Sequence, residues 1–331
     1  MLPHPVVRRT LSAPLLFALT VLVLLVFPLV LVAGTALSAL GGGRRRVTRL
    51  LWFATAWGVR ESAAVLTCVW LWFRCLGRPG AERHRDRHYA VIRRYVAGIN
   101  AAAHRWLGLR VEITGKEEGS GERPIIVLSR HAGPGDALLL AHHLLTDYGR
   151  RPHVVMKAAL QYDPAIDLLG NRLPNVFVPP GGGVADDIAA LAAGLGPRDA
   201  LVLFPEGGNF TPKRHRKAIG RLRRLRRRQA HRAARLRHVM PPRLGGALAA
   251  VEAAPDADVV FVAHSGLEEM ISPADVWREL PLTTTVRAHW WRIPAESIPE
   301  GREAREDWLY AEWERLDAWL GANPAEERRH A

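Results

Sequence analysis

A long stretch without charge dominates the beginning of the chain. From Thr10 to Gly43 there are 34 consecutive positions without a charged side chain. A helix needs about 20 apolar residues to cross a membrane, whereas the apolar core of a cleavable signal peptide has about 7–15. The length therefore favours a retained membrane anchor over a signal peptide. Pro14, Pro28 and Gly34 leave room for a kink or a re-entrant turn within it.

A second apolar segment follows at about residues 50–76. Arg60 and Glu61 lie near its middle, and each would cost about 2.5–3.5 kcal/mol at the centre of a bilayer. A helical hairpin whose second arm lies in the membrane interface therefore fits better than two full spans. Arginines at 44–46 and again between 74 and 87 indicate a cytoplasmic exit. We expect residues 1–87 to anchor the chain in the cell membrane, with the remainder on its cytoplasmic face.

The net charge of +14 is concentrated in two blocks. Residues 1–87 carry a charge of +9, residues 212–238 carry +13, and residues 239–331 carry −8. Strongly basic chains are candidates for nucleic acid binding. The block at 212–238 has no Phe, Tyr or Trp, so it lacks the stacking platforms of single-strand binders. Because the chain also carries a membrane anchor, we expect no nucleic acid partner.

From about His88 the pattern changes to short β-branched runs that alternate with helical ones. This alternation predicts an α/β sheet with helices on both faces, over residues 88–331. The predicted strands are Arg110–Thr114, Ile125–Ser129, His153–Met156, Val176–Val178, Ala200–Phe204, Val259–His264 and Thr283–Trp290. The predicted helices are 88–105, 136–147, 158–170, 184–194, 213–238 and 305–320. Because ligands of such sheets bind at the carboxyl ends of strands, we expect the functional residues at those ends.

A histidine and an aspartate follow the strand Ile125–Ser129. His131 and Asp136 are separated by four residues across a Gly-Pro-Gly turn. A carboxylate can fix the tautomer of an imidazole and stabilise the imidazolium, so that the other ring nitrogen takes a proton from a hydroxyl. The pair is therefore a candidate general base with its orienting group. The alternative is an aspartate that caps the next helix and an incidental surface histidine.

A second motif follows the strand Ala200–Phe204, where the chain continues as Pro205, Glu206 and Gly207. The His-x4-Asp motif and Phe-Pro-Glu-Gly, in this order, resemble the glycerolipid acyltransferase family, the group of 1-acylglycerol-3-phosphate acyltransferases. Lys157 looks like the lysine with which the family binds the phosphate of its substrate. Pro242-Arg243 is similar to the family's proline–arginine element, and the resemblance covers about residues 90–320.

The resemblance implies a mixed α/β sheet flanked by helices and a membrane-bound acyltransferase. His131 and Asp136 would be the catalytic pair, and Lys157, Glu206, Gly207 and Arg243 would bind substrate. A fatty acyl group would pass from acyl-CoA or acyl carrier protein to the free hydroxyl of a lysophospholipid, most simply 1-acylglycerol-3-phosphate, giving phosphatidic acid. We expect no further cofactor. We also expect no metal, because no His, Cys or Asp cluster has the spacing of metal ligands.

The chain departs from the family pattern at three places. Gly208-Asn209 stands where the family has Thr-Arg, and Arg130 stands where it usually has Asn before the histidine. A glycine loop at 181–183 stands where many members carry another phosphate-binding arginine; it is either a phosphate cradle or a plain flexible loop. These departures leave the head group of the acceptor open. The alternatives are another lysophospholipid, a glycolipid, or a catalytically silent lipid-binding protein of the membrane surface.

The basic block at 212–238 also has an apolar stripe, which predicts one amphipathic helix over 213–238 ended by Pro241-Pro242. We expect its cationic face to contact anionic lipid head groups, at about 1 kcal/mol per basic residue near the surface. Steering of the polyanionic CoA moiety and a merely solvated face are the alternatives. The oligomeric state stays open.

Overall fold

The computed structural model describes residues 2–40, 45–74, 82–115, 123–133, 135–225, 227–268 and 273–325. Within this part of the chain, a mixed sheet forms the centre of the molecule. Its strands are β1 (Val111–Thr114), β2 (Ile125–Ser129), β3 (Arg151–Lys157), β4 (Val176–Val178), β5 (Asp199–Leu203), β6 (Asp258–Ser265) and β7 (Val286–Ile293).

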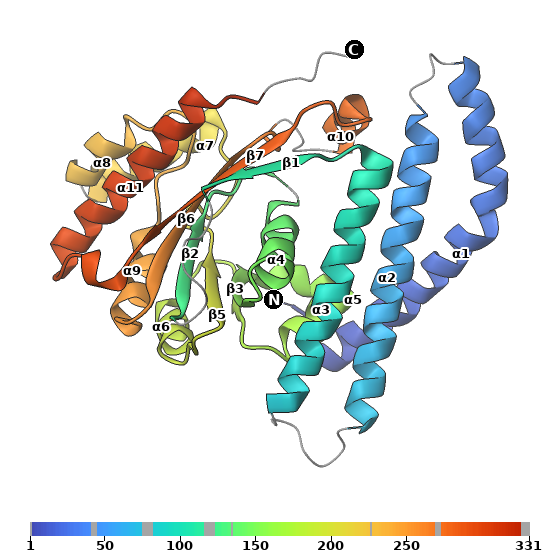
Figure 1. The fold of residues 1–331 in the computed structure, drawn as a ribbon, viewed down its shortest axis with the longest axis horizontal. Coiled ribbons are helices and arrows are strands. Elements are labelled where there is room, and N and C mark those ends of the chain that lie inside the picture. Colours follow the sequence, from blue (N-terminus) through green and yellow to red (C-terminus); the bar gives the residue numbers. More distant parts are fainter. Residues whose placement is uncertain are drawn as a thin grey trace.

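Helices flank this sheet and extend beyond it at the N-terminal end (Figure 1). The α-helices are α1 (Pro5–Leu40), α2 (Arg46–Arg74), α3 (Glu82–Ala102), α4 (Asp136–Thr146), α5 (Pro164–Gly170), α6 (Ala185–Ala193), α7 (Pro212–Leu225), α8 (Arg227–Ala233), α9 (Leu244–Ala253), α10 (Pro273–Glu279) and α11 (Arg302–Ala322). A π-helical turn η1 (Ala103–Leu107) and two 3-10 turns, η2 (Ala158–Tyr162) and η3 (Ala295–Ser297), complete the elements.

The strands lie in the order β1-β7-β6-β2-β5-β3-β4. Neighbouring strands are parallel except for β6 and β7, which are antiparallel. The carboxyl ends of β6, β2, β5, β3 and β4 therefore meet at one edge of the sheet. The predicted strands are all present within three residues of their expected limits. The prediction of a mixed sheet flanked by helices is confirmed.

Both faces of the sheet are covered, because the central strands are apolar on both sides. In β2, Ile126 and Leu128 pack toward α6, α9 and α11, whereas Ile125 and Val127 pack toward α4. These four side chains are fully buried. Continuous apolar runs of this kind are typical of strands buried on both faces. Beyond α4 the layers continue through α3 and α2 to α1 (Figure 1).

The first two helices run antiparallel, side by side. Thr20 of α1 accepts a hydrogen bond from Ser62 of α2 at 3.2 Å, and the rings of Phe27 and Trp52 lie 4.5 Å apart. α1 is the one described helix long and apolar enough to cross a membrane. It bends along its length (Figure 1), and it contains two prolines, each of which removes a helical hydrogen bond. The placement of the second arm in the membrane interface stays a prediction.

α2 is fastened to the rest of the protein near both of its ends. Arg46 donates from Nε to the carbonyl oxygen of Leu280 at 3.0 Å. Near the other end, the carbonyl oxygen of Cys68 accepts a hydrogen bond from Arg172 at 2.6 Å. α2 therefore lies along the sheet domain for most of its length, with α1 on its outer side (Figure 1).

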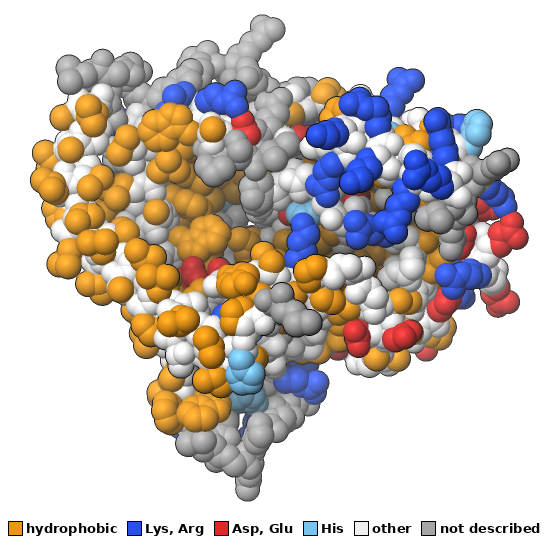
Figure 2. All heavy atoms as spheres, turned by 180° about the vertical axis from the view of Figure 1, so that it is seen from behind, with side chains coloured by type: hydrophobic (Ala, Val, Ile, Leu, Met, Phe, Trp, Pro, Cys, Tyr) orange, Lys and Arg blue, Asp and Glu red, His pale blue; other side chains and the backbone are white. Residues whose placement is uncertain are grey.

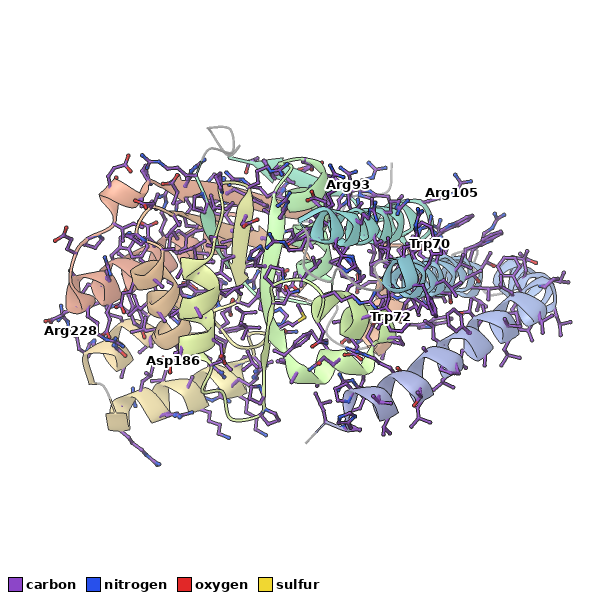
Figure 3. All side chains as sticks on the ribbon, turned by 90° about the horizontal axis from the view of Figure 1, so that it is seen from below. Trp70, Trp72, Arg93, Arg105, Asp186 and Arg228 are labelled. Carbon is purple, nitrogen blue, oxygen red and sulfur yellow. The ribbon has the colours of Figure 1, made fainter. Side chains whose placement is uncertain are left out.

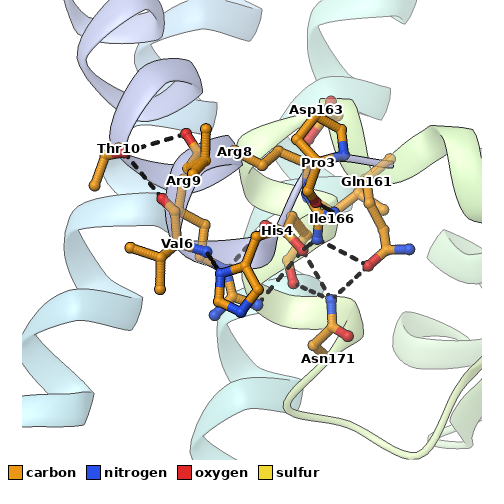
Figure 4. A network of polar contacts seen from close by, with 12 residues as sticks. Pro3, His4, Val6, Arg8, Arg9, Thr10, Gln161, Asp163, Ile166 and Asn171 are labelled. Atoms are coloured by element: carbon orange, nitrogen blue, oxygen red, sulfur yellow. Dashed lines mark hydrogen bonds and ion pairs between the residues drawn. The ribbon is translucent and has the colours of Figure 1, made fainter. Parts of the chain in front are cut away.

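The start of α1 is bound to the segment after β3 by a buried ionic network (Figure 4). Arg8 and Arg9 pair with Asp167 at 2.6 and 2.9 Å, and the Asp167 side chain is fully buried. Arg8 also donates to Gln161 at 3.0 Å, and Asn171 donates to Asp167 at 2.9 Å. The N-terminal end of the apolar helix is thus held against η2 and α5.

The expectation of one long arginine-rich helix over 213–238 is wrong. The described residues of this segment are helical in α7 and α8, and α8 ends at Ala233 rather than at residue 238. After α8, the carboxylate of Asp317 accepts hydrogen bonds from the backbone N–H groups of Arg237, His238 and Val239. Because α11 supplies acceptors for these amides, the chain leaves the helix well before Pro241.

Acidic residues of α11 neutralise arginines of α8. Arg228 pairs with Glu303 and Asp307, and Arg232 pairs with Glu314 at 2.9 Å, all three on α11. In the described part of the chain, none of the cations of α7 pairs with a carboxylate. Figure 2 shows Lys and Arg side chains gathered over this region and apolar side chains gathered over the helices at the opposite end. The cations of α7 therefore keep their charge free, unlike Arg228 and Arg232 of α8.

Candidate active site

Three predicted site residues come from the carboxyl ends of three neighbouring strands. His131 lies two residues after β2, Glu206 lies three residues after β5, and Lys157 is the last residue of β3. Because β2, β5 and β3 are adjacent and parallel, these residues lie at the same edge of the sheet. Strands are about 4.8 Å apart, so the ends of β2 and β3 are separated by roughly 10 Å.

His131 and Asp136 form the expected pair. The Nδ1 atom of His131 lies 2.8 Å from Oδ2 of Asp136, which is the first residue of α4. The aspartate side chain is 3% exposed, whereas the histidine side chain is 24% exposed. Among the described residues, the other ring nitrogen of His131, Nε2, has no hydrogen-bonding partner. That nitrogen is therefore the one available to a substrate hydroxyl.

The carboxylate of Asp136 is held by backbone amides as well. Its Oδ2 accepts hydrogen bonds from Ala132 at 2.9 Å and Gly133 at 3.3 Å, and its Oδ1 accepts one from Ala137 at 2.7 Å. Burial alone would raise the pKa of Asp136, but the hydrogen bond from His131, the nearby imidazole of His264 and the amide of Gly133 lower it below its usual value. The group is thus an anion fixed in position next to His131.

Glu206 is buried behind the histidine. Its side chain accepts a hydrogen bond from the backbone N–H of His131 at 2.9 Å and another from Met240 at 2.9 Å. Burial raises the pKa of Glu206 to about 7. Because both carboxyl oxygens contact backbone amides, Glu206 positions the His131 loop. This differs from the direct contact with substrate that we expected.

Gly207 and Arg243 are in contact, as members of one site would be. Gly207 has a φ of +63°, and a Cβ there would lie 2.5 Å from Cζ of Arg243. The backbone N–H of Arg243 donates to Pro205 at 2.9 Å. The exposed guanidinium of Arg243 therefore lies on the turn that follows Glu206. Lys157 is also exposed, at the end of β3.

A buried network behind the pair was not anticipated from the sequence. The guanidinium of Arg130 donates to Glu268 at 2.7 Å and to the carbonyl oxygen of His264 at 2.5 Å. His264, at the end of β6, has its Nε2 3.0 Å from the Arg130 carbonyl oxygen and 4.0 Å from Oδ2 of Asp136. Burial lowers the pKa of His264. The one available signal was the position of His264 at the end of a predicted strand.

Among the described residues, no group of three or more His, Cys, Asp or Glu side chains is arranged to hold a metal ion. The site therefore offers acid–base groups and cations: His131 as a base oriented by Asp136, and Lys157 and Arg243 as positive charges.

The comparisons with known proteins agree with this chemistry. An acyltransferase family model matches residues 110–265, which include all the predicted site residues. The fold is similar to that of the 1-acyl-sn-glycerophosphate (LPA) acyltransferase PlsC from Thermotoga maritima, with a TM-score of 0.56 and 16% sequence identity over 84% of this chain and 98% of that one. No curated protein matches the sequence. Residues 110–265 therefore match an acyltransferase domain, and this match and the shared fold support the glycerolipid acyltransferase family that the sequence motifs indicate.

Proposed function

We propose that this acyltransferase transfers a fatty acyl group from an acyl thioester to the free hydroxyl of a lysophospholipid, converting 1-acylglycerol-3-phosphate to phosphatidic acid. The observation that carries the proposal is the His131–Asp136 pair, which leaves one imidazole nitrogen open at the sheet edge that also carries Lys157 and Arg243. The acceptor carries its free hydroxyl close to a phosphate, and the site correspondingly carries a base, His131, at the same sheet edge as the cations Lys157 and Arg243.

In this reaction the Nε2 atom of His131 takes the proton of the acceptor hydroxyl. The oxygen attacks the thioester carbonyl, a C–O bond forms, and the C–S bond breaks when the tetrahedral intermediate collapses. The imidazolium returns the proton to the leaving thiolate. Asp136 holds Nδ1–H toward itself and stabilises the positive charge of the imidazolium.

The substrates supply what the transfer needs. Acyl-CoA or acyl carrier protein provides the acyl group, so no further cofactor is required. Lys157 and Arg243 bind the phosphate of the acceptor through charge-assisted hydrogen bonds. Another lysophospholipid or a glycolipid is the alternative acceptor, because the arginine of the family motif is replaced by Asn209.

The exposed surface of α1 and α2 suits insertion into a membrane. Large apolar side chains are exposed along α1, among them Leu15, Leu25 and Leu29. Trp70 and Trp72 are exposed on α2, toward the end of the molecule opposite Arg228 (Figure 3). Exposed apolar helices with interfacial tryptophans favour insertion into the cell membrane, and the unpaired cations of α7 favour its anionic cytoplasmic face.

The test uses the purified full chain in detergent with acyl-CoA and a panel of lysolipids, with products identified by mass spectrometry. We expect acylation of lysophosphatidic acid by the wild type and its loss in His131→Ala. His231→Ala, an exposed histidine on α8, is the matched control and should stay active. Acylation that survives His131→Ala would refute the mechanism. Transfer to sugar-bearing acceptors alone would refute the phosphatidate assignment.

A further inference from the structure

Two guanidinium groups lie on consecutive glycines beside His131. A Cβ at Gly207 would lie 2.5 Å from Cζ of Arg243, and a Cβ at Gly208 would lie 2.2 Å from Nη2 of Arg214. Both glycines have a positive φ, +63° and +151°. No other residue fits either position without displacing an arginine, so the Gly-Gly turn brings both cations against its backbone.

These cations are not neutralised within the protein. In the described part of the chain, neither guanidinium is paired with a carboxylate, and both side chains are exposed. Arg214 donates from Nη1 to the carbonyl oxygen of Asn209 at 3.0 Å, which fixes its position but leaves its charge. The nearest acidic residue along the chain, Glu206, is 3% exposed and contacts backbone amides.

The segment that leads into the turn contacts the reacting histidine. Glu206, the residue before the turn, accepts the hydrogen bond from the backbone of His131 at 2.9 Å. The ring of Phe204 lies 5.1 Å from the imidazole of His131. An anion held on the turn would therefore lie beside a hydroxyl that reaches His131.

The local charge selects an anion with several oxygens. Two planar guanidinium groups offer paired N–H donors, which match the oxygens of a phosphate. Arg214 is the third residue of α7 and therefore lies at the positive end of the helix dipole. The remaining cations of α7 extend this positive surface away from the turn.

We propose that Arg214, together with Arg243, binds a phosphate group of a substrate on the Gly207-Gly208 turn. Arg214 would thus supply a phosphate contact from α7, five residues beyond Asn209. The proposal rests on the proposed function for the identity of the substrate. The phosphate belongs either to the lysophospholipid acceptor or to CoA, and the experiment separates the two.

The first measurement needs no turnover. Binding of glycerol 3-phosphate to the full chain in detergent is followed by isothermal titration calorimetry, with glycerol as the phosphate-free probe. The variants are Arg214→Gln, Arg243→Gln and the control Arg216→Gln, an exposed arginine of the same helix. One charge-assisted hydrogen bond at an exposed site corresponds to about a tenfold change in affinity. We expect that weakening for the first two variants and none for Arg216→Gln.

The second measurement identifies the source of the phosphate. KM is determined for lysophosphatidic acid and monoacylglycerol, and for acyl-CoA and an acyl pantetheine thioester without nucleotide phosphates. A rise of about tenfold confined to lysophosphatidic acid assigns the turn to the acceptor. A rise confined to acyl-CoA assigns it to the donor, and either result supports the proposal.

Equal effects of the Arg216 and Arg214 substitutions would overturn the phosphate site while leaving acyl transfer intact. So would unchanged affinities for glycerol 3-phosphate together with unchanged KM values for lysophosphatidic acid and acyl-CoA. Conversely, phosphate binding that depends on Arg214 in a protein without lysolipid acylation would refute the proposed function and leave the site standing. Thermal unfolding of each variant is recorded, and only variants that keep the wild-type transition are compared.

Discussion

Substitution of Asp136 by asparagine tests the site most sharply, because the structure predicts which way the amide will turn. Oδ2 accepts hydrogen bonds from the His131 ring and from two backbone N–H groups, whereas Oδ1 accepts a single one, from Ala137 at 2.7 Å. An amide NH2 in place of Oδ2 would face two backbone donors, and in place of Oδ1 it would face one. The variant should therefore keep its oxygen toward His131 and preserve the tautomer.

The expected loss then comes from charge rather than from tautomer. A hydrogen bond to a charged partner contributes about 1.5–3 kcal/mol, against about 0.5–1.5 kcal/mol for a neutral one. At about 1.36 kcal/mol per tenfold change in rate, Asp136→Asn should lower kcat by about 10- to 100-fold. Asp136→Ala removes the orienting group altogether and should lower kcat by about 10³- to 10⁴-fold. The donor clash at Ala137 should lower the free energy of unfolding of the asparagine variant by about 1–3 kcal/mol.

The assay is steady-state acylation of lysophosphatidic acid, with kcat and KM determined separately and unfolding followed by circular dichroism. Asp147→Asn is the matched control, since Asp147 pairs with His143 on the exposed side of the same helix, and its kcat should not change. Equal losses in Asp136→Asn and Asp136→Ala, with both variants folded, would refute the predicted amide orientation. An Asp136→Ala effect that simply multiplies with that of His131→Ala would show that the two residues do not act as a unit.

Three further predictions follow from the buried and charged groups. Asp167→Asn leaves the buried Arg8 without its counterion and should lower the free energy of unfolding by about 3–5 kcal/mol, measured by thermal or urea unfolding in detergent. The pKa of Glu206 is raised to about 7 in the folded protein, so the free energy of unfolding of the wild type should decline as pH rises from about 4.5 through 7. Glu206→Gln should flatten that part of the pH profile, measured by urea unfolding. A Glu206→Gln profile with the same slope as the wild type would contradict the assignment. Lys217→Gln should weaken binding to anionic vesicles by about fivefold, one cation at about 1 kcal/mol, whereas Arg228→Gln should leave binding unchanged in a sedimentation assay because Arg228 is already paired with α11.

The strand ends that carry the site could be predicted from sequence because each strand is a short apolar run followed by an abrupt change in composition. This placed His131, Glu206 and Lys157 at the carboxyl ends of their strands. The network of Arg130 could not be found in this way. Its partner His264 lies 134 residues away, and only the order of strands in the sheet, with β6 next to β2, brings the two together.

The structure of the basic block at 212–238 could be predicted from its own sequence only in part. An apolar stripe at helical spacing predicted one helix, and helices do form there. The stripe contains no information about the acidic residues of α11, which lie about 75 residues later. These residues pair with Arg228 and accept hydrogen bonds from the backbone that follows α8. Likewise, the contact of Arg214 with Gly208 depends on the path of the loop between them, which no periodicity describes.

The positive charge of α7 and the exposed apolar side chains of α1 together indicate which class of ligand the protein suits. Arg228 and Arg232 of α8 pair with acidic residues of α11, whereas in the described part of the chain the cations of α7 have no carboxylate partner. The N-terminal end of α7 contacts the turn that follows Glu206. On the same face of the protein, apolar side chains gather over the helices at the other end (Figure 2). An amphiphile with an anionic head and an acyl tail complements both properties at once, whereas a nucleic acid would complement only the cations. The distribution of the charge, rather than its total, supports a lysophospholipid as the acceptor.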